Sequence, residues 1–198
     1  MKKNILIIGA PRCGKTTLVN MILKKNSNYE IIRGDALTCS YRALNTRKIC
    51  DCKNNKENSN NTINLDDISF PYEYYAFYIR EIYNNIKFDS CGIKRPVVIE
   101  TCWLSIKDYL EYFEDEFDIY CLGMPNESPK KLLTEIRNNS DDNDWTNLNG
   151  SFTMNMICNE IIEESKQLQK DCEKYNIPFF ETNGDRMNKL NEIVDIIL

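Results

Sequence analysis

The stretch Gly9-Ala10-Pro11-Arg12-Cys13-Gly14-Lys15-Thr16 decides the fold of this chain, because it matches the phosphate-binding pattern G-x-x-x-x-G-K-[ST] without a gap. An apolar run, Asn4-Ile5-Leu6-Ile7-Ile8, precedes it and is typical of a buried strand. The residues that follow, Thr17 to Lys24, have the pattern of a helix. Strand, glycine-containing loop and helix in this order predict a site for the phosphates of a nucleotide.

The chemistry of the loop follows from its residue types. Gly9 and Gly14 allow backbone geometry that other residues resist, so successive N–H groups can surround a phosphate. The helix that begins near Lys15 adds the positive end of its dipole. Lys15 is expected to reach the outer phosphates, and the hydroxyl of Thr16 is expected to bind Mg²⁺. The expected nucleotide-binding residues of the loop are Gly9, Arg12, Cys13, Gly14, Lys15, Thr16 and Thr17.

The composition fits one domain that contains both helices and strands. The chain has 198 residues, enough to bury a core, and a formal net charge of -5. This acidic balance argues against a general nucleic-acid binder, which normally carries a basic face. The apolar run after Met1-Lys2-Lys3 is too short for a signal peptide or a membrane span. We expect residues 1–198 to form a single cytoplasmic domain that does not bind membranes.

The nine cysteines are expected to be free thiols in a reducing compartment. Cys50-Asp51-Cys52 has no clear second pair and the chain has no histidine, so the sequence does not predict a cysteine-based metal site. Cys13 lies in the phosphate loop near a helix N-terminus, a position that lowers the pKa of a thiol. We interpret Cys13 as a small loop residue, with redox sensing as the alternative.

Strand candidates alternate with helical stretches, which predicts a largely parallel sheet. The expected strands are 5–8, 29–33, 96–100, 117–122 and 177–181. The expected helices are about 15–25, 72–87, 103–115, 128–138, 153–175 and 186–197. Two polar stretches interrupt this pattern, an insert near 53–64 and a segment near 137–150.

The size, the strand–helix order and the loop sequence resemble the P-loop kinase superfamily, which includes adenylate-kinase-like, shikimate-kinase-like and uridine-kinase-like enzymes. The resemblance implies a three-layer P-loop NTPase fold with helices on both faces of a five-stranded parallel sheet in the order 2-3-1-4-5. It is specific at the phosphate loop and at a few strand ends. Those ends meet at the edge where open α/β sheets bind ligands.

Two carboxylates follow predicted strands and are candidate site residues. Asp35 lies in Arg33-Gly34-Asp35, where related kinases place a carboxylate that orients the acceptor hydroxyl as a base; capping a helix over Ala36-Leu37-Thr38 is the alternative. Glu100 ends the strand Val97-Val98-Ile99-Glu100 and resembles a Walker B acid. We expect Glu100 to hold Mg²⁺ or to bind the acceptor.

Cations near the second polar stretch resemble those of kinase lids. Arg137 is expected to neutralise charge on the transferring phosphoryl group, with a helix C-terminal cation as the alternative. The segment near 137–150 would then close as a lid that excludes water, and Trp145 would anchor it or pack in the core.

The acceptor side is less determined by the sequence. Arg42 and Arg47, with Tyr41 beside them, favour an anionic acceptor such as a nucleoside monophosphate, while an uncharged alcohol or sugar stays open. The aromatic run from Tyr72 to Arg80 is interpreted as core packing, with one wall of an acceptor pocket as the alternative.

The motifs of a GTPase switch occur only in the wrong places. Asp89-Ser90-Cys91-Gly92 precedes a strand, and Asn188-Lys189-Leu190-Asn191 lies inside a predicted helix. After the fifth strand, Thr182-Asn183-Gly184-Asp185 puts Asp185 within reach of a purine edge, so GTP is an alternative to ATP.

Together these features predict an ATP-binding, Mg²⁺-dependent phosphotransferase that moves a γ-phosphoryl group to a small-molecule or nucleoside or nucleotide acceptor. The alternative is a nucleotide-dependent switch or regulatory P-loop NTPase without a small-molecule acceptor. The identity of the acceptor and the oligomeric state stay open at this point.

Overall fold

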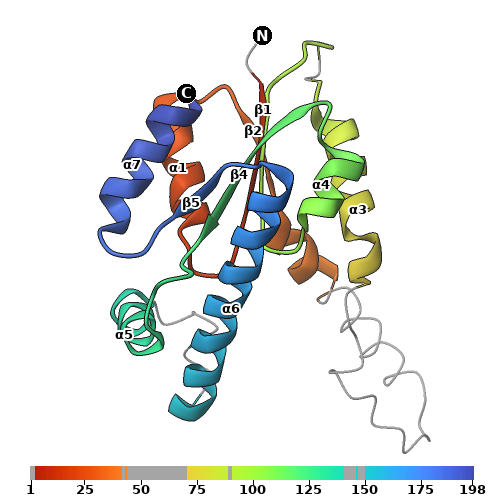
Figure 1. The fold of residues 1–198 in the computed structure, drawn as a ribbon. Coiled ribbons are helices and arrows are strands. Elements are labelled where there is room, and N and C mark those ends of the chain that lie inside the picture. Colours follow the sequence, from red (N-terminus) through yellow and green to blue (C-terminus); the bar gives the residue numbers. More distant parts are fainter. Residues whose placement is uncertain (1–2, 42, 44–70, 89–90, 141–145, 147–149) are drawn as a thin grey trace, which may run out of the picture.

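Five parallel strands form the central sheet (Figure 1). A computed structural model describes residues 3–41, 43, 71–88, 91–140, 146 and 150–198. The strands are β1 (Asn4–Gly9), β2 (Glu30–Arg33), β3 (Val97–Thr101), β4 (Phe117–Gly123) and β5 (Phe179–Glu181). Their order is β2-β3-β1-β4-β5, and each neighbouring pair is parallel. The predicted parallel sheet and its order 2-3-1-4-5 are therefore confirmed.

Helices connect these strands and cover the sheet on both faces. They are α1 (Lys15–Lys25), the 3-10 turn η2 (Tyr72–Tyr74), α3 (Tyr75–Ile86), α4 (Ile106–Tyr112), α5 (Pro129–Asn139), α6 (Ser151–Tyr175) and α7 (Arg186–Ile197). Residues 34–41 are also helical and follow β2 directly. Of the helices in the described residues, none combines the length and the apolar character needed to cross a membrane.

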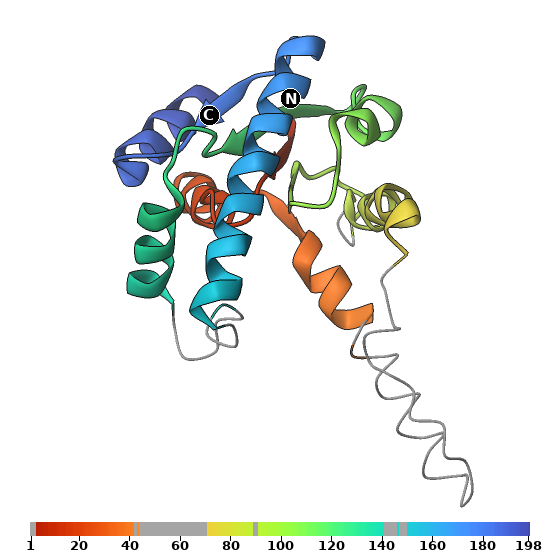
Figure 2. The same ribbon diagram turned by 60° about the horizontal axis from the view of Figure 1, so that its bottom comes forward.

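Strand alternation divides the apolar side chains into two cores. Along β1, Ile5 and Ile7 enter the core beneath α1, α5, α7 and the first half of α6, whereas Leu6 and Ile8 enter the core beneath α3 and α4. This is the period of two expected of a strand that is buried on both faces. Figures 1 and 2 show the same division, with α1 and α7 on one side of the sheet and α3 and α4 on the other.

Local signals explain where the helices differ from prediction. The helix expected over 103–115 is shorter, Ile106–Tyr112, because Ser105 and Asp108 form a capping box at its start and Phe113 leaves helical geometry at its end. The helix expected over 72–87 is divided into η2 and α3. At α5, Ser128 accepts a hydrogen bond from the backbone of Lys131, as an N-cap does.

A polar cluster closes the amino-terminal edge of the sheet. The Asn4 side chain donates to the hydroxyl of Tyr83 and to the carbonyl of Glu116, both at 3.0 Å, and accepts from the backbone of Val97 at 2.9 Å. Glu116 in turn pairs with Arg80. Asn4 is 5% exposed, so its three hydrogen bonds compensate for burying an amide in the core.

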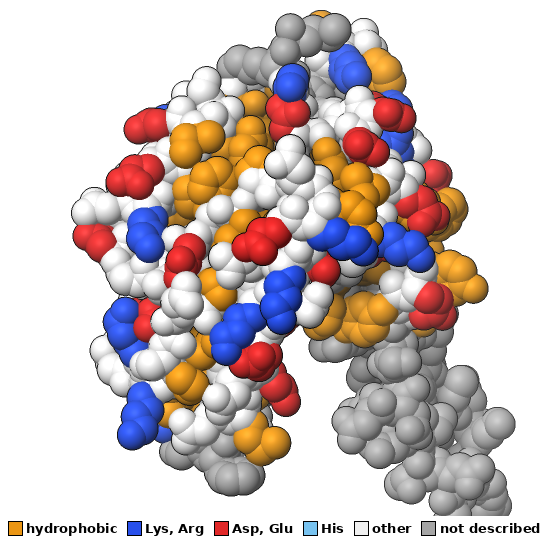
Figure 3. Space-filling view, in the orientation of Figure 1, with side chains coloured by type: hydrophobic (Ala, Val, Ile, Leu, Met, Phe, Trp, Pro, Cys, Tyr) orange, Lys and Arg blue, Asp and Glu red, His pale blue; other side chains and the backbone are white. Residues whose placement is uncertain are grey.

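Basic and acidic side chains are mixed on the face shown in Figure 3, with no broad patch of either sign.

Candidate functional site

The loop between β1 and α1, which the sequence predicts to bind phosphate, contains backbone in the left-handed region. Arg12 and Gly14 have positive φ values of 65° and 97°, and Gly14 is the N-cap of α1. A Cβ added to Gly9 would lie 2.4 Å from the carbonyl oxygen of Leu122 on β4, so only glycine fits where the loop crosses that strand. When residues with left-handed backbone precede a helix, the N–H groups of the backbone point to one side. Together they form a concave site that can bind an anion.

Lys15 is positioned directly over this loop. Its ammonium group donates to the carbonyl oxygens of Gly9 at 2.9 Å and Ala10 at 2.8 Å. The side chain is therefore folded back along the loop, where an ammonium can contact phosphate oxygens as a point charge.

The pKa of Cys13 is not lowered by its place in the loop, contrary to what a helix N-terminus favours. Cys13 is fully buried, and burial raises the pKa of its thiol, although the nearby Lys15 charge opposes the rise. Burial outweighs the helix terminus, so the thiol is neutral and shielded. This favours the interpretation of Cys13 as a small loop residue.

Thr16 and Glu100 meet beside the loop. The Thr16 hydroxyl donates to Glu100 Oε1 at 3.2 Å, which joins the start of α1 to the end of β3. Glu100 is 7% exposed, and its Oε2 is buried without a hydrogen-bond partner. Arg33 on β2 places its Nε 4.0 Å from Oε1.

The carboxyl of Glu100 therefore carries a poorly compensated charge. Burial raises its pKa, while the Arg33 charge, the hydrogen bond from Thr16 and the Lys15 charge oppose the rise. A hydroxyl and a carboxylate side by side are oxygen ligands of the type that Mg²⁺ takes beside nucleotide phosphates. The unpartnered Oε2 shows that the pair fits a cation. No larger group of carboxylates, thiols or imidazoles suited to a metal occurs in the described part of the chain.

Asp35 lies at the same edge of the sheet. Gly34 separates it from Arg33, the last residue of β2. The chain is already helical at Gly34, so Asp35 belongs to the first helical turn and the alternative that it precedes the helix as a cap is wrong. Its side chain is exposed, and the Cys102 thiol approaches its Oδ1 at 3.9 Å. Burial raises the pKa of Cys102 to about 12, so this thiol is neutral. Asp35 is thus an exposed carboxylate next to Glu100 and the phosphate loop.

Residues after β3 continue this edge with aromatic side chains. Trp103 and Tyr72 form a ring pair with centroids 4.7 Å apart, and their exposed fractions are 42% and 36%. Of the aromatic run, Tyr75 and Ile79 are buried in the core, whereas Tyr74, Phe77 and Tyr78 are exposed. The run from Tyr72 to Arg80 therefore contains both aromatic side chains that pack in the core and aromatic side chains that are exposed.

The sequence reasoning missed Glu164 on α6. The residue as a whole is exposed, yet partial burial raises the pKa of its carboxyl against the opposing charge of Lys15. Its charge also raises the pKa of Cys102. Glu164 therefore faces the same edge from α6, and only tertiary structure distinguishes it from the neighbouring acids of that helix.

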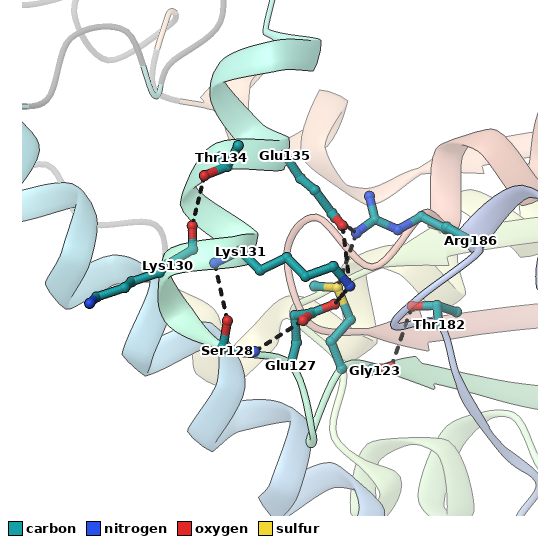
Figure 4. A network of polar contacts seen from close by, with 10 residues as sticks. Gly123, Glu127, Ser128, Lys130, Lys131, Thr134, Glu135, Thr182 and Arg186 are labelled. Carbon is teal, nitrogen blue, oxygen red and sulfur yellow. Dashed lines mark hydrogen bonds and ion pairs between the residues drawn. The ribbon is translucent and has the colours of Figure 1, made fainter.

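Arg186 at the start of α7 was also missed. Figure 4 shows Arg186 and Glu135 of α5 pointing toward one another, with their nitrogen and oxygen 2.6 Å apart. Lys131 of α5 contacts Glu127 at 2.9 Å and Glu135 at 3.8 Å. A Cβ added to Gly14 would lie 3.4 Å from Arg186 Cδ, so Arg186 packs against the phosphate loop. The network connects α5 and α7 beside the loop between β1 and α1.

The structure gives the remaining predicted residues local roles and does not bring them to Glu100. Asp185 is the N-cap of α7 and accepts from the backbone of Asn188 at 3.2 Å and from its side chain at 2.6 Å. Thr17 is exposed on the first turn of α1. Arg137 is exposed in the last turn of α5, and its charge lowers the pKa of Cys158 on α6, partly offsetting the effect of burial.

Several predictions lie outside the described residues. They concern Arg42, Arg47, Cys50-Asp51-Cys52, the insert near 53–64, Trp145 and most of the lid segment after 140. Thr146 is described, and Arg12 of the phosphate loop donates to its hydroxyl at 3.3 Å.

The architecture and the phosphate loop together define the fold of the P-loop kinases. A gluconokinase from Sinorhizobium meliloti 1021 is similar to this chain with a TM-score of 0.57 and 14% identity, covering 99% of this chain and 91% of that one. A shikimate kinase from Bacteroides thetaiotaomicron is similar with a TM-score of 0.56 and 13% identity, covering 98% of each chain. At these identities the likeness is one of fold. No protein-family model matches the chain, and no curated protein matches it in sequence.

Proposed function

We propose that this chain is an ATP-dependent phosphotransferase that transfers the γ-phosphoryl group to a hydroxyl of a small molecule. The observation that carries the proposal is the pairing of Thr16 with the buried, half-satisfied carboxylate of Glu100 beside the ammonium of Lys15. Such a grouping suits a metal–triphosphate complex. The likeness to two small-molecule kinases in fold supports the same class.

Each part of the site then has a role in phosphoryl transfer. The backbone of the loop and Lys15 would bind the β- and γ-phosphates. Thr16 and Glu100 would hold Mg²⁺, which, when bound, neutralises charge on those phosphates. The exposed carboxylate of Asp35 would accept the proton of the acceptor hydroxyl and orient its oxygen for in-line attack. Arg137 would neutralise charge on the transferring group.

ADP release is the direct test of this proposal. Release from Mg²⁺–ATP and Mg²⁺–GTP is measured with and without acceptors, for the wild type, Lys15→Ala and Lys24→Ala. Lys24 is an exposed lysine on the same helix and provides a matched control. We expect acceptor-stimulated release that Lys15→Ala removes and Lys24→Ala leaves unchanged.

A binding measurement separates the possible failures. Mg²⁺–ATP stabilises a protein that binds it in the native state only, so the melting temperature of the wild type should rise. Asp35→Asn should keep this rise and lose turnover. Stimulated release at the wild-type rate in Asp35→Asn would remove Asp35 from the base role. Slow release that no acceptor stimulates would instead favour a nucleotide-dependent switch.

A further inference from the structure

The ring pair of Tyr72 and Trp103 lies where the phosphoryl acceptor of the proposed function would bind. Trp103 follows Thr101, the last residue of β3, with only Cys102 between them. The Cys102 thiol is 3.9 Å from the carboxylate of Asp35, so the rings and the proposed base belong to one edge of the sheet. Trp103, 42% exposed, presents a large aromatic ring at this edge, against which a planar ligand can stack.

The backbone at Trp103 is held by a chain of hydrogen bonds. The Thr101 hydroxyl accepts from the backbone N–H of Trp103 at 3.0 Å and shares a hydrogen bond of 2.9 Å with the hydroxyl of Tyr75. A Cβ added to Gly34 would lie 2.0 Å from the Tyr75 hydroxyl. The helix that begins at Gly34 and carries Asp35 therefore packs closely against Tyr75. The backbone at Trp103 and the start of the helix that carries Asp35 therefore pack on the same pair of side chains, Thr101 and Tyr75, which fixes the backbone positions from which a site could be built.

The charges along this edge favour an uncharged acceptor over an anion. Asp35 and Glu164 are acidic, and Glu100 has a buried oxygen without a partner. Arg33, the cation of β2, lies 4.0 Å from Glu100 and donates to Asn20 at 3.1 Å. Within the described residues, the charge of Arg33 is directed to Glu100. Lys15 is a second cation, whose charge reaches Cys102 and Glu164, and the proposed function assigns it to the phosphates of the nucleotide. An anionic acceptor beside Asp35 would therefore meet the like charges of Asp35 and Glu164.

We propose that the acceptor is an uncharged compound that joins a hydroxyl group to a planar ring, as a nucleoside does. The inference rests on the proposed phosphotransferase function. The planar ring stacks on Trp103 at the exposed face of the ring pair, and the hydroxyl lies at the carboxylate of Asp35. In the transfer step the acceptor oxygen forms a bond to the γ-phosphorus, and the bond from that phosphorus to the β,γ-bridging oxygen breaks. The leaving electron pair stays on ADP, and the hydroxyl proton passes to Asp35.

A panel of charged and uncharged acceptors tests this inference. The panel contains the common nucleosides, their 5′-monophosphates, ribose and glucose, and the two carboxylates gluconate and shikimate. ADP release is measured for the wild type, Trp103→Ala, Trp103→Phe and Tyr175→Ala. Tyr175 is an equally exposed aromatic residue, 42%, at the end of α6, so it controls for loss of an exposed ring.

We expect nucleosides to stimulate release more than their monophosphates or the carboxylates. Trp103→Ala should raise the KM for the nucleoside by about tenfold with little change in kcat, because stacking contributes to binding and not to the reacting atoms. Trp103→Phe should recover most of this loss, and Tyr175→Ala should behave as the wild type.

Fluorescence gives a second readout that does not depend on turnover. The chain has two tryptophans, so in Trp145→Phe only Trp103 remains. Stacking of a nucleoside on Trp103 should change its emission, and ribose should not.

The outcomes separate this inference from the proposed function. Release stimulated by anions or by sugars, with a KM that Trp103→Ala does not change, overturns the inference and leaves the phosphotransferase intact. If no acceptor stimulates ADP release, the proposed function is overturned. If no nucleoside changes the fluorescence of Trp103, the inference is overturned as well.

Discussion

Replacing Glu100 by Gln is expected to stabilise the ligand-free protein while it abolishes phosphoryl transfer. Glu100 is buried and its Oε2 lacks a partner, so the native state carries a charge that few contacts compensate. An unsatisfied buried polar group costs about 1–3 kcal/mol. Gln keeps the shape and still accepts from Thr16, and it also leaves one polar group of the amide without a partner. The expected gain therefore comes only from removing the buried charge. We therefore expect a gain of about 1 kcal/mol in the free energy of unfolding, or about 2–4 °C in melting temperature.

The gain should depend on pH in a definite direction. Because burial raises the folded-state pKa of Glu100 above 4.5, the native state binds this proton more tightly than the unfolded state. Wild-type stability therefore falls as pH rises from the unfolded pKa through the folded pKa. The advantage of Glu100→Gln is fully present above the folded pKa and fades as pH falls toward 4.5.

Thermal unfolding at about pH 5.5 and about pH 8 measures both effects. Glu163→Gln is the control, because Glu163 is exposed and pairs only at the surface with Lys166, so its loss should change stability by less than about 1 kcal/mol. Adding Mg²⁺–ADP should stabilise the wild type more than Glu100→Gln. A Gln variant less stable than the wild type at about pH 8 would refute the reasoning, since it would show that Arg33 and Thr16 compensate the charge.

Three further outcomes are expected. Gly34→Ala should lower the free energy of unfolding in urea by about 2 kcal/mol, because the added Cβ would overlap a hydroxyl oxygen 2.0 Å away. Gly150→Ala is the control: no described atom lies within 4 Å of its added Cβ, so only the weaker N-cap of α6 should lower stability, by less than about 1 kcal/mol. Asn4→Ala should cost about 2–3 kcal/mol in the same assay by leaving buried partners unsatisfied, and a loss below about 0.5 kcal/mol would contradict this. In native protein, iodoacetamide should modify exposed Cys39 well before buried Cys13, as peptide mass spectrometry would show; equal rates would mean that the loop opens readily.

The fold was accessible from the sequence because its decisive signals are local. The loop from Gly9 to Thr16 and the apolar runs that become β1, β3 and β4 are continuous in the chain. Strand order is a tertiary property, and it came from the resemblance to P-loop kinases that the loop supported.

The site could be predicted only in part from the sequence, because it is formed by residues that the tertiary structure brings together. Asp35 and Glu100 were found because they follow strands, but nothing in the pattern of α6 separates Glu164 from its exposed neighbours. Arg186 did leave a signal. A cation in the first turn of a helix opposes the helix dipole, and here Glu135 from α5 supplies the compensating charge.

The long helix α6 belongs to both halves of the molecule. Its first half packs in the core beneath α1 and α7 through Met154, Cys158 and Ile161, and Cys172 near its end lies in the opposite core with α3 and α4. Its 25 residues form a helix roughly 37 Å long that runs across the molecule (Figure 2). A rigid rod anchored in two cores prevents either one from opening alone, so native-state hydrogen exchange should protect both layers to a similar depth, as one cooperative unit.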